Sequence, residues 1–294
     1  MKLRSHRIQR LATYTIFGLI LAGTALYVGA LGPGPGKALK LDHFWCYIVS
    51  SETPQPAVTV TLQDQFQTAT VSVGSPLQFC NPAQKTIGPV VTPIVDLNNH
   101  LTMYNLLTSA PLSTSRTLTA TNQFGAQQLT VDKATTLMVP TQKDALRFPT
   151  KLDHYLCYPV TGTSLELGVS LTDQFQSQDI IVEKPVLFCN PVAKTIGNKT
   201  SRIQNAAAHQ VCYNIRLPQS TTSRQVPIQN QFETDTFTLT TTQLLCVPPR
   251  RRRSHRSSTL NVSHGWSRRS RKTVRIHFCL VSKPFASPSD MWRL

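Results

Sequence analysis

Alternation of apolar and polar residues, rather than a helical stripe, dominates the middle of this chain. Residues 58–62 read Val-Thr-Val-Thr-Leu and residues 167–171 read Leu-Gly-Val-Ser-Leu, so apolar side chains return at every second position. A period of two is typical of a strand that buries one face. The signal returns at 68–73, 128–131 and 236–239, where Thr and Val favour pleated structure. The pattern therefore predicts an all-β protein.

A sequence phrase recurs four times, beginning at His43, His100, His154 and His209. Each copy has Cys or Met three residues after the His, then Tyr, an Asp/Asn-Gln-Phe triplet, and a closing Cys or Met before a Pro-containing turn. Copies one and three close on Phe-Cys-Asn-Pro, whereas copies two and four close on Leu-Met-Val-Pro and Leu-Cys-Val-Pro. The order is therefore A-B-A-B, with the A-B unit at 41–146 and again at 152–249.

One copy of about 50 residues would bury too little apolar surface to be stable alone, whereas a pair of about 100 residues could form one domain. We therefore expect an all-β fold of two tandem sandwich- or barrel-like domains, residues 41–146 and 152–249. Each domain would contain two β-repeats of about 50 residues, with about four strands in each repeat.

The cysteines of the repeats predict disulfides. In copy two both cysteines are replaced together, by Met103 and Met138, which indicates that the two positions are bonded to each other in the other copies. Closing a loop of about 35 residues stabilises a fold by on the order of 3–4 kcal/mol in the chain-entropy description. Such bonds indicate an oxidising compartment. The expected pairs are Cys46–Cys80, Cys157–Cys189 and Cys212–Cys246.

A metal site is the alternative use of these positions. A His/Cys/Cys or His/Met/Met set could hold Cu(I), because thiolate and thioether ligands suit that ion, so an extracytoplasmic copper-binding protein is one alternative function. However, His and Cys three residues apart on a strand point to opposite faces. We therefore expect no metal and no cofactor, with the histidines hydrogen-bonded at a sheet edge.

The Asp/Asn-Gln-Phe triplets predict turns. An Asp or Asn before a bend accepts hydrogen bonds from its downstream backbone, and the Phe would then anchor the turn in the core. Calcium binding is a second possibility, but only two of the four residues are charged and no acidic loop accompanies them. The predicted structural residues are Asp64, Phe66, Asn122, Phe124, Asp173, Phe175, Asn230 and Phe232.

Taken together, the Asp-His-Phe-x-Cys-Tyr, Asp-Gln-Phe and Cys-Asn-Pro phrases resemble a bacterial extracytoplasmic repeat domain of unknown function. The resemblance covers roughly residues 41 to 249, and copy two departs from it at both cysteine positions. It implies a secreted or cell-surface β-protein, and it supplies no activity, cofactor or catalytic residue.

The start of the chain predicts export. Lys2, Arg4, Arg7 and Arg10 precede the apolar run of residues 14–30, which is typical of a secretory signal peptide. Residues 1–38 would form this signal and a Gly/Pro linker. Residues 11–31 would also be long enough for an uncleaved membrane anchor of about 20 residues, and both alternatives place the repeats outside the cytoplasm.

The net charge of +16 arises mainly at the two ends. Most of it follows Pro249, so the repeats are nearly neutral, and a nucleic-acid partner, which would require a basic folded face, is not expected for them. Residues 250–294 are predicted to be a disordered basic tail that either binds an anionic polymer or is an unselected extension. Cys279 has no partner among the repeats and would be a free thiol or an intermolecular link.

The repeats lack enzyme signatures such as Gly-x-Ser-x-Gly or a phosphate-binding loop. A carbohydrate-active enzyme, the remaining alternative, would need two carboxylates that converge in one cleft. We therefore expect a non-enzymatic secreted or cell-surface repeat protein. It would be structural, or it would bind a macromolecule or envelope polymer through exposed loops.

Overall fold

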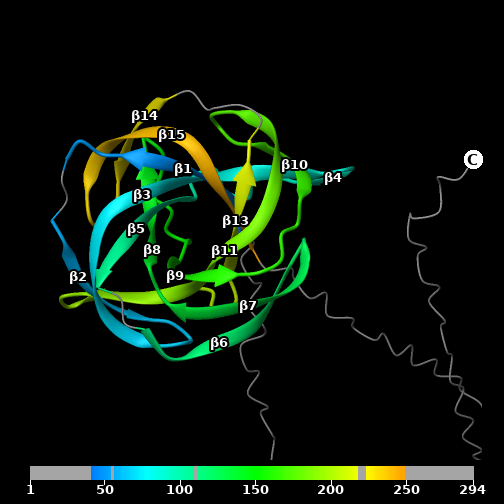
Figure 1. Cartoon of the computed structure of the whole chain (residues 1–294). Coiled ribbons are helices and arrows are strands. Elements are labelled where there is room, and N and C mark those ends of the chain that lie inside the picture. The colour runs from blue at the N-terminus through cyan, green and yellow to red at the C-terminus, as the bar shows by residue number, and fades with distance from the viewer. Residues whose placement is uncertain (1–40, 54–55, 109–110, 218–222, 249–294) are drawn as a thin grey trace, which may run out of the picture. The chain divides into compact units, whose positions relative to one another are not determined.

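The computed structural model describes residues 41–53, 56–108, 111–217 and 223–248 (Figure 1). This part of the chain is all-β, as the alternating pattern predicts, and contains 15 strands. It contains no helix that could cross a membrane. The predicted signal segment, the linker, the basic tail and Cys279 lie outside the described residues.

The strands follow the four copies. Copy one forms β1 (His43–Ser50), β2 (Val58–Gln63), β3 (Thr68–Ile87) and β4 (Val90–Thr92). Copy two forms β5 (His100–Thr108), β6 (Pro111–Asn122), β7 (Gly125–Lys133) and β8 (Thr136–Lys143). Copy three forms β9 (His154–Thr161), β10 (Leu167–Thr172), β11 (Ser177–Ile196) and β12 (Lys199–Ser201). Copy four forms β13 (Gln210–Arg216), β14 (Arg224–Gln229) and β15 (Thr234–Val247).

The first and last long strands of every copy join into one closed ring of antiparallel strands. The ring runs β1-β3-β5-β8-β9-β11-β13-β15, and β15 pairs again with β1. Figure 1 shows this closure where β1, in blue, lies beside β15, in orange. Each copy supplies only two of these eight strands, so all four copies are needed before the ring strands have neighbours on both sides.

Four of the remaining strands, β2, β7, β10 and β14, belong to hairpins that pair with a ring strand of another copy, whereas β4 and β12 pair only within their own copy. β2 of copy one pairs with the end of β11 in copy three, and β10 of copy three pairs in return with the end of β3. β14 of copy four pairs with the end of β8 in copy two. Copies one and three therefore exchange hairpins, and the strands of the two halves are interleaved in one compact unit.

This interleaving differs from the expected division into tandem domains at 41–146 and 152–249. The physical reason is that one A-B pair supplies four ring strands and leaves two ring edges open. Unpaired edges expose backbone donors and acceptors, and here the second pair of copies covers them. The composition of the repeats predicts their strands, but the smallest closed unit is four copies and not two.

The three predicted disulfides are present and lie in a single buried layer. The bonded cysteines face each other across the first and last strand of their copy, and Met103 faces Met138 at the same place in copy two. All eight side chains belong to one apolar cluster that also contains Phe44, Leu101, Leu152, Tyr155 and Leu244. The methionine pair therefore replaces one bonded pair in a common core layer.

Residues next to the sulfur layer point to the other face of the ring strands, because neighbouring side chains in a strand alternate. Trp45, Leu156 and Leu245 pack there against hairpin residues such as Val60 and Leu171. The ring is thus apolar on both faces, with sulfur-rich packing on one side and the hairpins on the other.

Candidate functional site

Each Asp/Asn-Gln-Phe triplet forms the turn that the sequence predicts. Asp64 Oδ1 accepts hydrogen bonds from the backbone N–H of Phe66 and Gln67, at 2.8 and 2.9 Å. Both bonds to the first residue of the triplet recur in copies three and four, and the first of them recurs in copy two. Every triplet therefore closes a turn at the tip of a hairpin.

In copies one and three, the turn docks on a tyrosine of the other copy. Tyr158 Oη donates to Asp64 Oδ2 at 2.9 Å, and Asn190 Nδ2 donates to the same oxygen at 3.0 Å. Copy three repeats this arrangement, with Tyr47 and Asn81 donating to Asp173 Oδ2 at 2.8 and 3.0 Å. We call each contact between a triplet and its tyrosine a junction.

In copies two and four, the junction hydrogen bond runs in the opposite direction. Asn230 Nδ2 donates to Tyr104 Oη at 2.6 Å, and Tyr104 then donates to the carboxylate of Glu233. Asn122 Nδ2 likewise donates to Tyr213 Oη at 2.8 Å. The type-A copies pair Asp with an asparagine from Cys-Asn-Pro, whereas the type-B copies have Val at that place. The triplet therefore begins with Asp where this asparagine is present and with Asn where valine replaces it.

The phenylalanine of each triplet lies between an aromatic ring and a cation. Phe124 and Phe232 meet the junction tyrosines edge-on, with ring centroids 5.2 Å apart, and Phe66 and Phe175 do the same. Lysines of the preceding copy lie 4.4, 4.4 and 4.9 Å from the ring centroids of Phe124, Phe175 and Phe232. The four rings are only partly buried, but they pack against the hydrophobic clusters of the core, so each anchors its turn at a contact between copies.

The charged groups at the junctions are held away from water. Burial lowers the pKa of Lys85 and of Lys194 to about 7, because a desolvated ammonium is less favourable. Lys85 Nζ has no hydrogen-bond acceptor among the described residues and faces the Phe124 ring. Cation–π contacts contribute about 0.5–2 kcal/mol, with the larger values at desolvated sites.

Three of the four histidines of the repeated phrase accept a hydrogen bond from the glutamine of a triplet. Gln174 Nε2 lies 2.9 Å from His100 Nε2, and Gln123 and Gln231 contact His43 and His154 in the same way. Burial lowers the pKa of His100 to about 4 and that of His43 to about 3. These two rings are therefore neutral and buried, and they are hydrogen-bonded, as we expected, at the first residue of a strand.

The metal alternatives lack a ligand set in the part of the chain that the structure describes. The six repeat cysteines are bonded to each other and supply no thiolate. No group of three or more His, Cys, Asp or Glu side chains lies close enough to hold an ion in residues 41–248, the short gaps excepted. The Asp64 and Asp173 carboxylates are occupied by protein donors.

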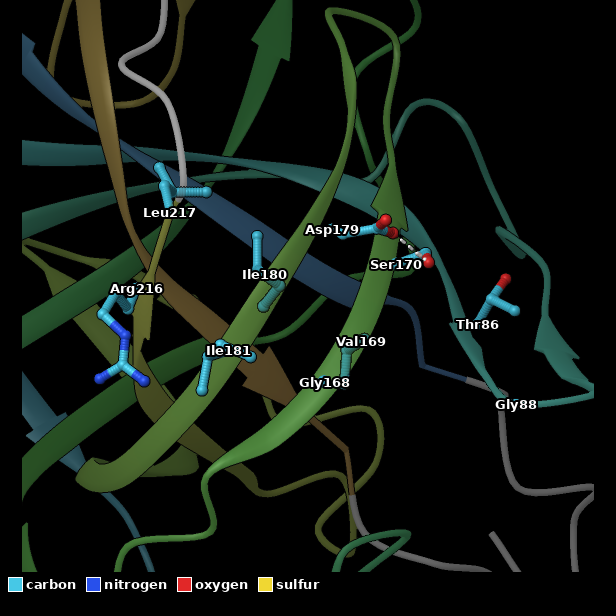
Figure 2. A pocket seen from close by; sticks show the side chains of 10 residues that line it. All are labelled: Thr86, Gly88, Gly168, Val169, Ser170, Asp179, Ile180, Ile181, Arg216 and Leu217. Carbon is cyan, nitrogen blue, oxygen red and sulfur yellow. Dashed lines mark hydrogen bonds between the residues drawn. The ribbon is translucent and has the colours of Figure 1, made fainter.

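An open pocket, which the sequence did not suggest, lies over the β10–β11 hairpin (Figure 2). Its volume is about 710 Å³. Its lining includes Ile181 on the outer face of the hairpin, together with Val169 and Ile180, whose side chains are buried in the core. Figure 2 shows Ser170 and Asp179 pointing toward each other at one side. Gly168 contributes no side chain, and a Cβ added there would meet no described atom within 4 Å. In copy one the equivalent residue is Thr59. The glycine at this position is therefore the feature of the sequence that could have indicated the pocket.

The chemistry of the pocket suits binding of an apolar or amphipathic group. Asp179 is the one carboxylate among its lining residues, and it accepts a hydrogen bond from Ser170. Arg216, at the other side, is held by Glu183 and Glu166 at 2.6 and 3.0 Å. Glycoside hydrolysis commonly uses two carboxylates that flank the bond, and these lining residues supply one.

A family model described as a repeat of unknown function (DUF7450) matches residues 100–248, about half of the chain. This chain belongs to that family. The match covers copies two, three and four of the phrase, and the family description carries no activity. Neither the curated proteins nor the solved structures include a match to the chain.

Proposed function

We propose that this chain is an exported, non-enzymatic DUF7450 protein of the bacterial cell surface or medium, which has a structural role or binds an envelope polymer. One observation carries the proposal. The repeated polar residues, including the triplets, the tyrosines and the histidines, are engaged with other copies of the repeat. Residues that hold a scaffold together are not free to act on a substrate.

The location is supported by the disulfide layer. Three bonds within one core form and persist in oxidising compartments such as the periplasm or the exterior. The basic and apolar start of the chain agrees with export. The structure of that segment lies outside the described residues.

Recognition would take place on surfaces that differ between copies, since the junctions are shared by all four. The pocket on the β10–β11 hairpin is such a surface, because its lining includes Gly168 of copy three, where copy one has Thr59. Ligand sites in proteins are mostly apolar hollows with a few polar groups, and Ser170 and Asp179 supply such groups here.

The test is a binding screen of the full chain against insoluble peptidoglycan, lipopolysaccharide and acidic polysaccharides. A chain that ends at Pro249 shows the contribution of the tail, and its circular dichroism spectrum checks that it is folded. Gly168→Thr introduces the residue of copy one into the pocket, and we expect it to weaken any polymer binding that uses the hollow. Release of sugar or peptide products from these polymers by the pure protein would contradict a non-enzymatic role.

A further inference from the structure

We propose that the end of the ring where the copies connect docks on an anionic lipid bilayer. The contact would use the loop of residues 88–99 and the nearby Phe148. This inference rests on the proposed export, with the apolar run of residues 11–31 retained in the membrane. It assigns a partner to a surface that the repeats do not need for their own packing.

Both ends of the described chain lie at this end of the ring, which we call the connecting end. Phe44 in β1 pairs with Cys246 in β15, so residues 42 and 248 leave the ring side by side. The register also places the start of β5 beside Cys80 and the start of β9 beside Met138. The loops that join successive copies, 88–99, 144–153 and 197–209, therefore share the connecting end.

Exposed apolar side chains gather there. Eight large hydrophobic residues are exposed within the described residues, and five of them lie in two of these connections: Val90 and Val91 in β4, Val95 and Leu97 after it, and Phe148. The two loops touch, because the backbone N–H of Arg147 donates to Asn98 Oδ1 at 3.1 Å. The Asp42 carboxylate accepts hydrogen bonds from the backbone N–H groups of Val95 and Asp96. The apolar loop thus lies directly against the start of the described chain.

Copy three provides an internal control for this loop. There Asp153 accepts hydrogen bonds from the backbone N–H groups of Gln204 and Asn205, at 2.7 and 2.9 Å, as Asp42 does in copy one. However, the residues that correspond to Val90 and Val91 are Lys199 and Thr200. The same backbone arrangement therefore forms with a polar surface, so the fold does not require the exposed valines. Clustered exposed apolar residues indicate an interaction surface.

The chain outside the structure indicates what covers this surface. The apolar run of residues 11–31 is joined to Leu41 by residues 32–40, which span at most about 30 Å when fully extended. A bilayer that receives this run would therefore lie within reach of the apolar loop. A docked loop would bury valine and leucine side chains at the lipid boundary.

Charge at the connecting end matches anionic lipid. Arg147, Lys151 and Arg202 are exposed in its loops, as is Lys199 at the base of one of them. Basic residues near a membrane surface are attracted to anionic lipid headgroups.

The first experiment uses the full chain, as purified, with vesicles of phosphatidylglycerol and phosphatidylcholine that carry brominated acyl chains. Tryptophan is introduced at the connecting end by Leu97→Trp and at the far end of β5 by Leu107→Trp, two sites of similar exposure (60% and 57%). We expect bromine to quench the fluorescence of the added tryptophan about twofold for Leu97→Trp and not for Leu107→Trp. Only an indole side chain that is inserted into the bilayer contacts the brominated acyl chains. Equal quenching at both sites, or none at Leu97, overturns the proposal.

The second experiment compares two variants that introduce the same charge at equivalent positions. Val91→Asp is expected to lower the affinity for anionic vesicles about tenfold, because it removes an apolar contact and adds repulsion. Thr200→Asp, at the matching place in copy three, should change that affinity much less. If both variants act equally, the basic segments alone bind lipid and the apolar loop has no role in docking.

Two other outcomes would also overturn this inference. If Val91→Asp converts a dimer into a monomer in gel filtration and leaves vesicle binding intact, the loop contacts a second copy of the chain. If the full chain binds acidic polysaccharide but no vesicle, the partner is not a lipid surface, and the proposed function survives. If the cysteines are found reduced in the native protein, the proposed export fails independently of any lipid result.

Discussion

Copies two and four occupy equivalent places in the ring, yet one lacks the bond that the other has. Met103 faces Met138 in copy two, and Cys212 faces Cys246 in copy four, at the same register and in the same buried cluster. The strands take the same positions in both copies. The comparison shows that this core layer needs an apolar pair of suitable size, whereas the covalent bond is an addition. A disulfide acts largely by restricting the unfolded chain.

Reduction of all three disulfides is the change with the largest expected effect on the stability of the protein. Each bond closes a loop of 32 to 34 residues, and in the chain-entropy description the three together contribute about 10 kcal/mol. That is similar to the total stability of a typical domain, about 5–15 kcal/mol. We expect the reduced protein to unfold at a much lower urea concentration. Equal urea midpoints for the reduced and oxidised protein would contradict a stabilising role for the bonds.

Exchanging the methionine pair and the cysteine pair measures directly what the covalent bond adds to stability. The double change Met103→Cys with Met138→Cys is expected to form a fourth disulfide and to raise the free energy of unfolding by about 3 kcal/mol. The reverse change, Cys212→Met with Cys246→Met, should lower it by a similar amount while keeping the core filled. Urea titrations of both variants measure this. A much larger loss for the methionine variant than for Cys212→Ala with Cys246→Ala would show that copy four cannot accommodate the methionine pair.

The junction tyrosines of the same two copies allow a smaller test. The hydroxyl of Tyr104 donates to Glu233, a buried carboxyl whose pKa is raised by burial. Tyr213 instead donates to the uncharged Gln127 at 3.0 Å. Tyr104→Phe would leave the Glu233 carboxyl without this donor and should cost about 1–3 kcal/mol. Tyr213→Phe is the matched control, and urea denaturation that shows it to be the more destabilising change would contradict this account.

The pH dependence of stability tests the buried histidine of copy two. Burial lowers the pKa of His100 to about 4, below the ordinary value of 6.5, so the unfolded chain binds its proton first as the pH falls. The contribution of His100 is fully present above about pH 6.5 and is lost progressively toward pH 4, by at most about 1.4 kcal/mol per pH unit. His100→Gln should flatten this part of the curve of unfolding free energy against pH. An unchanged slope would show that His100 is not buried in its neutral form.

The pattern of residues predicts the local features because they depend on neighbours in the chain. Alternating Thr and Val predict strands such as Val58–Gln63, and Asp64 or Asn230 closes its own turn through hydrogen bonds to backbone two and three residues away. The cysteine pairing was also predictable, since the joint change at Met103 and Met138 marks two positions in contact. These inferences need no knowledge of how the copies meet.

The sequence by itself thus determined the strands, the turns and the bonds within each copy. Tertiary structure alone decided that copies one and three exchange hairpins and that four copies close one ring. The deciding contacts, such as Tyr158 with Asp64, join residues 94 positions apart, and every copy offers a similar tyrosine and a similar turn. Which pair meets depends on where open strand edges lie once all four copies are assembled. The hollow beside Gly168 likewise exists only after its neighbouring strands are in place.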